Sequence, residues 1–490
     1  MPPYQSAAKP QRSLETISMW ALVATLIVAV FIFIPSATIP FTATKTYVLA
    51  AGALITLALY ILARLSRGNV ILPPFALVGA LWLPVIAYTL SAAFSGTSFM
   101  NALWGSGLEP DTLGFMLVTA VLGTMTALIL RRSEHYRSFL QAGAVAFMVL
   151  VAGEALVVII GQFAPNTISP AFSIVGSISD LAFLLGLGLI GILLALRELE
   201  LGARARRALV ASGIGSVILL AIVNSSLVWI LLALVSLGLF VESVMQHNSK
   251  IGDADLDDIA VIDEEPLLTA DTNEGNRSLV MPLAVLAISL FFIIGGTLGG
   301  ALANTLHVNE INVRPSLQST LAVGDKVISA APVFGSGPGT FGAEWLKYRD
   351  PSLNATVFWN VNFSSGIGFI PTSFVTTGLI GAFAWIALLA LLLVFGLRML
   401  IVRAPHDAFI RYVAIFSFLA FVYLFALAIF DLPSTIVLAL AFVFAGLFVS
   451  TTRFAAQGRQ WGIIFSRSPR IGFVIVFSLT ILLLLSVVAA

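Results

Sequence analysis

The residues best suited to chemistry are concentrated in one polar stretch, residues 302–366, of an otherwise apolar chain. It contains basic, aromatic and amide side chains, and the candidates among them are Arg314, Lys326, Trp345, Lys347, Arg349, Trp359 and Asn360. Aromatic rings offer flat apolar faces on which a sugar can stack. Guanidinium and ammonium groups hold phosphates through charge-assisted hydrogen bonds. The stretch therefore predicts a sugar or phosphate site, although an interfacial belt of aromatic and basic residues has a similar composition.

Arg314 stands just before a predicted helix. Pro315 suits a first helical position, and apolar residues follow at helical spacing, at Leu317, Leu321 and Ile328. We expect an amphipathic helix over 315–330 that lies on the membrane surface. At its N-terminal end, the guanidinium and unpaired backbone N–H groups could share one anion. Snorkelling of Arg314 to lipid headgroups is the plainer alternative.

A glycine-rich run, GSGPGTF, follows this helix at 335–341. Three glycines and a proline within five residues permit a tight turn and a close backbone approach. A phosphate-binding loop is excluded, because no lysine followed by serine or threonine stands at the required spacing. The run predicts a bend between two surface helices.

Acidic side chains on the same predicted side of the membrane supply candidate general bases. They are Glu109 and Asp111 in WGSGLEPDT, with Asp180, Glu310, Asp325, Glu344, Asp350 and Asp431. Spacing alone does not choose among them, and Glu109 and Asp111 are taken as substrate-binding candidates. Glu154 lies inside a predicted span, where an ionisable group is either functional or held by hydrogen bonds.

Neither a metal site nor a cofactor is predicted. The four histidines do not have the spacing of metal ligands, and the chain has no cysteine. The net charge of +1, without a basic tract, argues against nucleic acid as a partner.

The elements that must position these residues are membrane spans. The chain is 59% hydrophobic and only 10% charged, which is typical of an all-α, multi-pass helical bundle. Windows long enough to cross the hydrocarbon layer number about twelve or thirteen. They are 14–36, 46–64, 74–95, 113–130, 140–163, 180–197, 208–223, 227–243, 279–301, 378–400, 408–430, 432–450 and 471–489. The pair that meets at Asn224 could instead be one broken helix.

The distribution of basic residues orients these spans. With a cytoplasmic N-terminus, 20 of the 25 lysines and arginines fall in cytoplasmic loops, as such loops favour. We therefore expect a single domain, 1–490, in the cytoplasmic membrane. The segment 244–277 is then expected to be an acidic, disordered cytoplasmic linker, with a calcium site as a weaker alternative, and 302–366 is expected to be a large extracytoplasmic loop.

This pattern resembles the O-antigen ligase and O-antigen polymerase family. The matching pieces are a large loop before the last spans with Arg314, the run PVFGSGPGTF at 332–341, and TTGLIG at 376–381. The resemblance implies a metal-independent, inverting glycosyltransferase. Its donor would be a glycan on undecaprenyl diphosphate, and its acceptor would be a hydroxyl of another glycan or of a lipid. The enzyme would also contact the membrane lipids. Arg314 would be catalytic, with Lys326, Lys347 and Arg349 in support.

Two positions depart from the family pattern. The family places a histidine shortly before the glycine-leucine segment, where this chain has WNVNFSSGIGFIP, and an arginine after a serine at the outer end of a mid-chain span, where it has Asn224, Ser225 and Ser226. Two alternatives therefore stay open. One is a polysaccharide or lipid transporter or flippase, and the other is a noncatalytic scaffold of the cell envelope.

Overall fold

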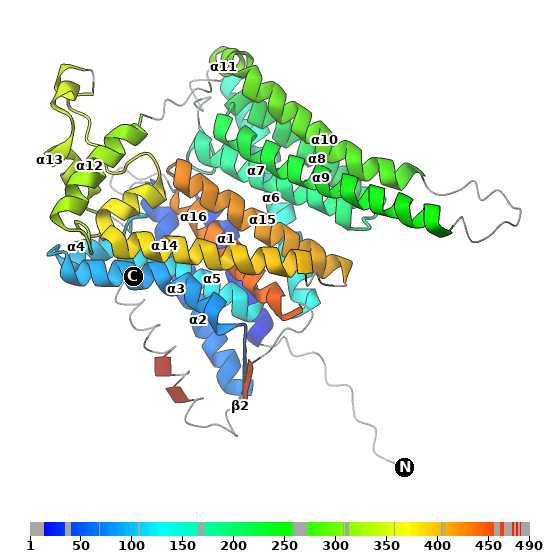
Figure 1. The fold of residues 1–490 in the computed structure, drawn as a ribbon, viewed down its shortest axis with the longest axis horizontal. Helices are drawn as coiled ribbons and strands as arrows, with labels where there is room; N and C mark the ends of the chain where they lie inside the picture. The colour runs from blue at the N-terminus through cyan, green and yellow to red at the C-terminus, as the bar shows by residue number, and fades with distance from the viewer. Residues whose placement is uncertain are drawn as a thin grey trace, which may run out of the picture. The chain divides into compact units, whose positions relative to one another are not determined.

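The protein is all-α apart from one pair of short strands in the computed structural model (Figure 1). The structure describes residues 14–34, 41–67, 69–105, 108–164, 172–257, 272–306, 313–356, 358–402, 407–454 and 461–464, together with isolated residues between and beyond them. The helices are α1 Leu14–Phe31, α2 Phe41–Arg67, α3 Phe75–Phe94, α4 Phe99–Trp104, α5 Leu113–Ile129, α6 Ser133–Phe163, α7 Ile178–Glu198, α8 Ala203–Val223, α9 Ser226–Asp257, α10 Thr272–Ile294, α11 Gly296–Thr305, α12 Leu317–Ala330, α13 Phe341–Tyr348, α14 Phe369–Val402, α15 Ala408–Phe430 and α16 Thr435–Thr451. The strands are β1 Asn69–Leu72 and β2 Trp461–Ile464.

Within the described residues, ten helices are long and apolar enough to cross a membrane, which confirms a multi-pass helical protein. Two of the thirteen predicted spans are present in another form. The apolar helix α5 has only 17 residues, and the predicted span 279–301 is bent by 76° between α10 and α11. The last predicted span, 471–489, lies almost wholly outside the described residues.

The single domain predicted from the sequence is divided into two compact units. Unit 1 comprises 1–146, 174–176 and 312–490, and unit 2 comprises 147–173 and 177–311. Hydropathy marks each helix as apolar but does not specify which helices share a core, because lipid-facing and protein-facing surfaces are both apolar.

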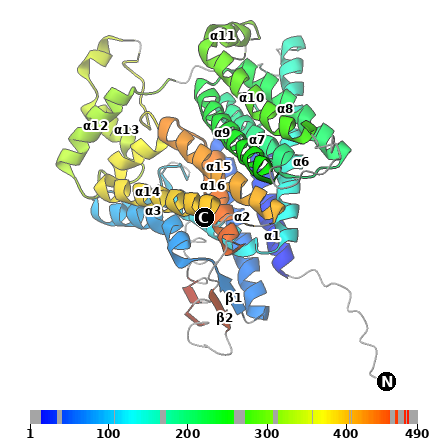
Figure 2. The same cartoon turned by 45° about the vertical axis from the view of Figure 1, so that its right-hand side comes forward.

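The core of unit 1 is the pair α5 and α16, with α1, α2, α3, α14 and α15 around it. Gly446 on α16 lies so close to α5 that a Cβ there would stand 2.0 Å from the carbonyl oxygen of Gly123. Small residues allow this approach of two backbones, as is usual between membrane helices. Next to this core, α3 and α14 lie side by side, and α12 and α13 gather at one end of α14 (Figure 2).

In unit 2, α7 packs against α8 and α9, and α9 packs along α10 (Figure 1). α8 and α9 are two separate helices. Asn224 ends α8 in the left-handed conformation, with φ of 52°, and its amide donates to the carbonyl oxygen of Gly296 over 3.0 Å. Glu154 in α6 is buried and accepts from the hydroxyl of Ser173 over 2.8 Å, so the hydrogen-bonded alternative describes it.

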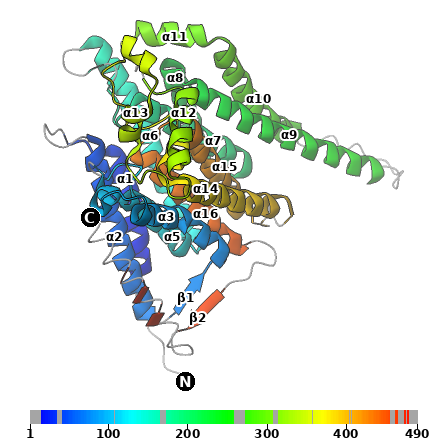
Figure 3. The same cartoon turned by 60° about the vertical axis from the view of Figure 1, so that its left-hand side comes forward.

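Two local features differ from expectation. The strands β1 and β2, which were not predicted, pair antiparallel with Asn69 opposite Ile464 (Figure 3). The acidic segment 244–277 is helical at both ends, because α9 continues to Asp257 and α10 begins at Thr272. No proline, which would interrupt a helix, occurs between Val244 and Asp257. Residues 258–271 lie outside the described residues.

Candidate functional site

Helix α14 is broken inside its sequence, at the TTGLIG motif. Gly378 has φ of 65° and ψ of −157°, which lies outside the helical region. A break leaves backbone groups of the helix without partners inside it. The glycine-rich segment, Pro332–Phe341, supplies those partners. The N–H groups of Leu379 and Ile380 donate to the carbonyl oxygens of Pro332 and Val333 over 3.0 and 3.2 Å.

The other side of the break is satisfied by the same segment. Gly337 donates its backbone N–H to the carbonyl oxygen of Thr376 over 2.8 Å. Gly335 lies directly against Gly378, because a Cβ on Gly335 would stand 2.5 Å from the Gly378 nitrogen. The segment connects α12 and α13, as predicted. It also fills the break in α14, a role that was not predicted, and we call Pro332–Phe341 the plug. Sequence offered one signal for the second role, a glycine at the first position of the predicted span 378–400.

A third segment, the WGSGLEPDT loop between α4 and α5, is tied to this plug through Asp111. One carboxylate oxygen accepts from the Tyr88 hydroxyl over 2.7 Å and from the Thr376 hydroxyl over 3.0 Å. The other oxygen accepts from the N–H of Gly339 over 3.2 Å. Burial raises the pKa of Asp111 to about 6, although these three hydrogen bonds act to lower it. Asp111 therefore joins three segments that are far apart in the sequence.

The stability of the protein should depend on the ionisation of Asp111. Folding raises its pKa from 3.8 to about 6. This carboxyl thus favours folding most below pH 4, and its contribution is lost as the pH rises through 6. The contribution of Asp111 to the free energy of unfolding differs by roughly 3 kcal/mol between these two pH ranges. Relative to Asp111→Asn, the wild type should gain thermal stability in detergent when the pH falls from 7.5 to 4.5. If the difference in melting temperature between the wild type and Asp111→Asn stayed constant from pH 7.5 to 4.5, the raised pKa of Asp111 would be contradicted.

Arg314 lies where α14 begins and α15 ends. Its Nη1 donates to the carbonyl oxygens of Ile367 and Phe430, each over 3.3 Å, and to the carboxylate of Asp431 over 2.5 Å. Its side chain is 33% exposed and that of Asp431 is 16% exposed. Among the described residues, Nη2 and Nε of Arg314 have no hydrogen-bond partner. The guanidinium is therefore held in place on one side and open on the other.

Among the candidate acidic residues, Asp431 is the one that contacts Arg314 in the described residues. Spacing could not select it, since 117 positions separate it from Arg314. It follows the last residue of α15, and its carboxylate also accepts from the N–H of Leu432 over 2.8 Å. The available signal was an acid at the end of an apolar span, one of several in this chain.

The helix after Arg314 begins later than predicted. α12 starts at Leu317 because the hydroxyl of Ser316 accepts from the N–H of Ser319 over 3.1 Å, which makes Ser316 the N-cap. Its buried face is Thr320, Val323, Gly324 and Val327, whereas Leu317 and Leu321 remain exposed. At this N-terminus, the hydroxyl of Ser316 accepts from the N–H group of Ser319, and Arg314 donates to Asp431.

The aromatic and basic residues around α13 have different roles. Trp345 is buried in a small core with Phe341 and Val375, and its ring meets Phe363 edge to face, so it offers no face to a sugar. Arg349 is engaged inside the segment, with the carbonyl oxygen of Trp359 at 2.9 Å and Asn354 at 3.1 Å.

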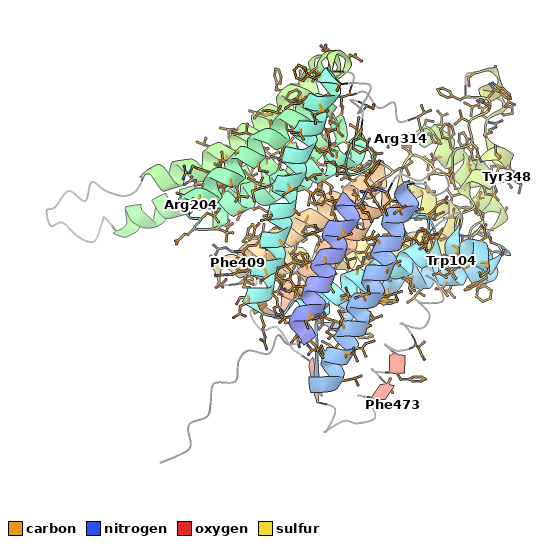
Figure 4. The ribbon with its side chains drawn as sticks, turned by 180° about the vertical axis from the view of Figure 1, so that it is seen from behind. Trp104, Arg204, Arg314, Tyr348, Phe409 and Phe473 are labelled. Atoms are coloured by element: carbon orange, nitrogen blue, oxygen red, sulfur yellow. The ribbon has the colours of Figure 1, made fainter. Side chains whose placement is uncertain are left out.

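The other predicted residues remain accessible. Lys326, Lys347, Trp359 and Asn360 are exposed, and Glu109 is half-buried. Lys347 lies over the ring of Tyr348, with Nζ 4.7 Å from its centroid. Tyr348 and Arg314 stand apart in Figure 4, so the cations of the polar stretch do not form one tight cluster.

In the part of the chain that the structure describes, no group of three or more His, Asp or Glu side chains is placed to hold a metal ion. The helices and this plugged break define a multi-pass membrane protein with a polar junction at one end of α14. No protein-family model matches the chain, and no curated protein is significantly similar to it.

Proposed function

We propose that this protein polymerises or ligates glycans carried on undecaprenyl diphosphate at the outer face of the cytoplasmic membrane. One observation carries the proposal. Two segments on which the family resemblance depends, PVFGSGPGTF and TTGLIG, interlock at the break in α14, and Asp111 of the WGSGLEPDT loop bonds to both of them. Arg314 is anchored to Ile367, just before the same helix begins. Such convergence is expected if these segments build one site.

The proposed reaction is a single displacement at the anomeric carbon of the donor sugar. The acceptor hydroxyl oxygen forms the new bond as the bond to the diphosphate oxygen breaks, with inversion of the anomeric configuration. The hydroxyl proton passes to a base, and undecaprenyl diphosphate leaves with its negative charge increased. A fixed cation at the diphosphate stabilises the charge that develops in the transition state.

Arg314 fits this role because its open N–H groups can form a fork to phosphate oxygens. Asp431 is a positioning residue, since its carboxylate holds the guanidinium that would contact the diphosphate. It is poorly placed as the base, because in an inverting displacement the acceptor attacks from the face opposite the leaving group. Exposed Trp359, Asn360 and Lys347 are then available to the glycan.

A transporter or flippase is the second candidate, because broken helices often carry substrate and ion sites in transporters. Two breaks occur in the described residues, at Gly378 and between α10 and α11. At Gly378, however, Pro332, Val333 and Gly337 already occupy backbone groups on both sides of the break. This break therefore has little free capacity for an ion, which favours the enzyme over the transporter.

Replacement of Arg314 in the native host tests the proposal. Cells with Arg314→Ala should show shortened or unattached surface glycans on electrophoresis, whereas Arg314→Lys should retain part of the wild-type pattern because it keeps the charge. Immunoblots of the membrane fraction control for insertion. Normal glycans in both variants, with the protein present at wild-type level, would refute the role of Arg314.

A further inference from the structure

A second charged cluster lies in unit 1, apart from the break in α14. It is built where α1 begins and where α2, α5 and α16 end, and we call it the arginine cluster: Glu15, Tyr60, Arg64, Arg131 and Arg453. α1 and α2 are the two neighbouring blue helices of Figure 4. Tyr60 and Arg64 are at most 1% exposed, Glu15 is 2% exposed and Arg453 is 9% exposed. Charged groups are rarely buried in this way unless they are compensated.

The formal charges in the arginine cluster do not balance. Glu15 is the carboxylate for both Arg64, at 2.5 Å, and Arg131. Arg453 has no carboxylate partner among the described residues and donates to the carbonyl oxygen of Ala127 over 2.8 Å. Within the described part of the chain, the cluster thus contains three guanidinium groups and one carboxylate. Residues 1–13 and 455–490 contain neither aspartate nor glutamate.

Several donors in the arginine cluster are also unused. The hydroxyl of Tyr60 and the Nε atoms of Arg131 and Arg453 are buried without a hydrogen-bond partner among the described residues. Arg131 and Arg453 both lie within electrostatic range of the Tyr60 hydroxyl. A buried donor without a partner destabilises the folded protein, because it has lost its hydrogen bonds to water. A negatively charged group that accepts several hydrogen bonds would balance the excess positive charge and also satisfy the unused donors.

We propose that the arginine cluster binds a phosphate group, held by Arg131, Arg453 and the hydroxyl of Tyr60. Arginine is suited to phosphate because its planar fork matches two phosphate oxygens. The cluster lies at the ends of the spanning helices α1, α2 and α16, the depth at which lipid headgroups lie. The group belongs either to a phospholipid headgroup or to a soluble phosphate. This site is independent of the proposed glycan transfer.

Thermal stability of the delipidated full-length protein in detergent tests the proposal. The probes are inorganic phosphate, phosphatidylglycerol, and diacylglycerol with the same acyl chains, all at one ionic strength. Tyr60→Phe removes a single oxygen atom. Tyr47→Phe is the matched control, since Tyr47 is on the same helix and 40% exposed. A third variant, Arg453→Gln, removes one cation of the proposed site.

We expect a phosphate-bearing probe to raise the melting temperature of the wild type while diacylglycerol does not. Tyr60→Phe should weaken the apparent affinity about fivefold, the effect of one lost hydrogen bond, and Tyr47→Phe should leave it unchanged. Arg453→Gln should abolish the response; if it does not fold, Tyr60→Phe still decides. A response to phosphatidylglycerol alone identifies a headgroup, and a response to inorganic phosphate identifies a soluble ligand.

Two results would overturn the proposal. One is a wild type that responds to neither phosphate-bearing probe, and the other is Tyr60→Phe with the affinity of the wild type. In either case the arginines would serve only to compensate the negative ends of α2, α5 and α16.

Discussion

Gly378→Ala should fold poorly or not at all. Gly378 has φ of 65° and ψ of −157°, a conformation that is essentially restricted to glycine. An added Cβ would stand 2.5 Å from the nitrogen of Gly335 and 2.7 Å from the carbonyl oxygen of Val333. Both are backbone atoms of the plug and cannot move aside cheaply. Strain and overpacking together should cost roughly 4 kcal/mol or more, measured as lost folded protein in size-exclusion chromatography and as a lower melting temperature.

Gly79→Ala is the matched control for this prediction. Gly79 lies inside α3 of the same unit, and an added Cβ there meets nothing within 4 Å. Alanine in a helix interior is favoured over glycine by about 1 kcal/mol, so this variant should be as stable as the wild type or more so. Equal behaviour of Gly378→Ala and Gly79→Ala would show that the break in α14 is not held by close backbone approach.

Under the proposed function, Arg314→Ala should slow glycan transfer by the purified protein about 100-fold or more, because the departing diphosphate would lose its fixed cation. Arg314→Lys should recover part of the rate, since it restores a point charge without the fork. Asp431→Asn should cause a smaller loss, because the guanidinium keeps two carbonyl partners, those of Ile367 and Phe430. The initial rate of product formation at saturating donor measures each effect.

Arg204→Ala provides the control for the loss of a positive charge. Arg204 is exposed in the first turn of α8 and is labelled in Figure 4. Its removal should leave the transfer rate unchanged. If Arg204→Ala and Arg314→Ala lost activity equally, the effect would be one of net charge and not of a site.

The spans were predictable because burial in lipid requires long apolar helices. The first part of α14 was missed because it is rich in Ser and Thr, which look polar in the sequence. In the helix, Thr372 and Ser373 donate their hydroxyl protons to the carbonyl oxygens of Gly368 and Ile370. Such local bonding lets hydroxyl residues lie inside a buried helix.

The contacts that build the candidate site were not predictable from spacing. Asp111 and Thr376 are 265 positions apart, and Arg314 and Asp431 are 117 positions apart. Each pair meets only because particular helices of unit 1 pack together. Residue type drew attention to Arg314 and to the glycine-rich segment in the sequence. The burial of Trp345 was not foreseen, since an aromatic ring looks the same in a sequence whether it is buried or exposed.

The most direct test of the central claim uses the purified wild-type protein in lipid vesicles with a glycan on undecaprenyl diphosphate. Polymerisation or ligation predicts that one undecaprenyl diphosphate is released for each new glycosidic bond, and that the new linkage has the inverted anomeric configuration by NMR. Release should fall with Arg314→Ala. Folded wild-type protein that moves the intact donor across the bilayer, without releasing undecaprenyl diphosphate, would contradict the account.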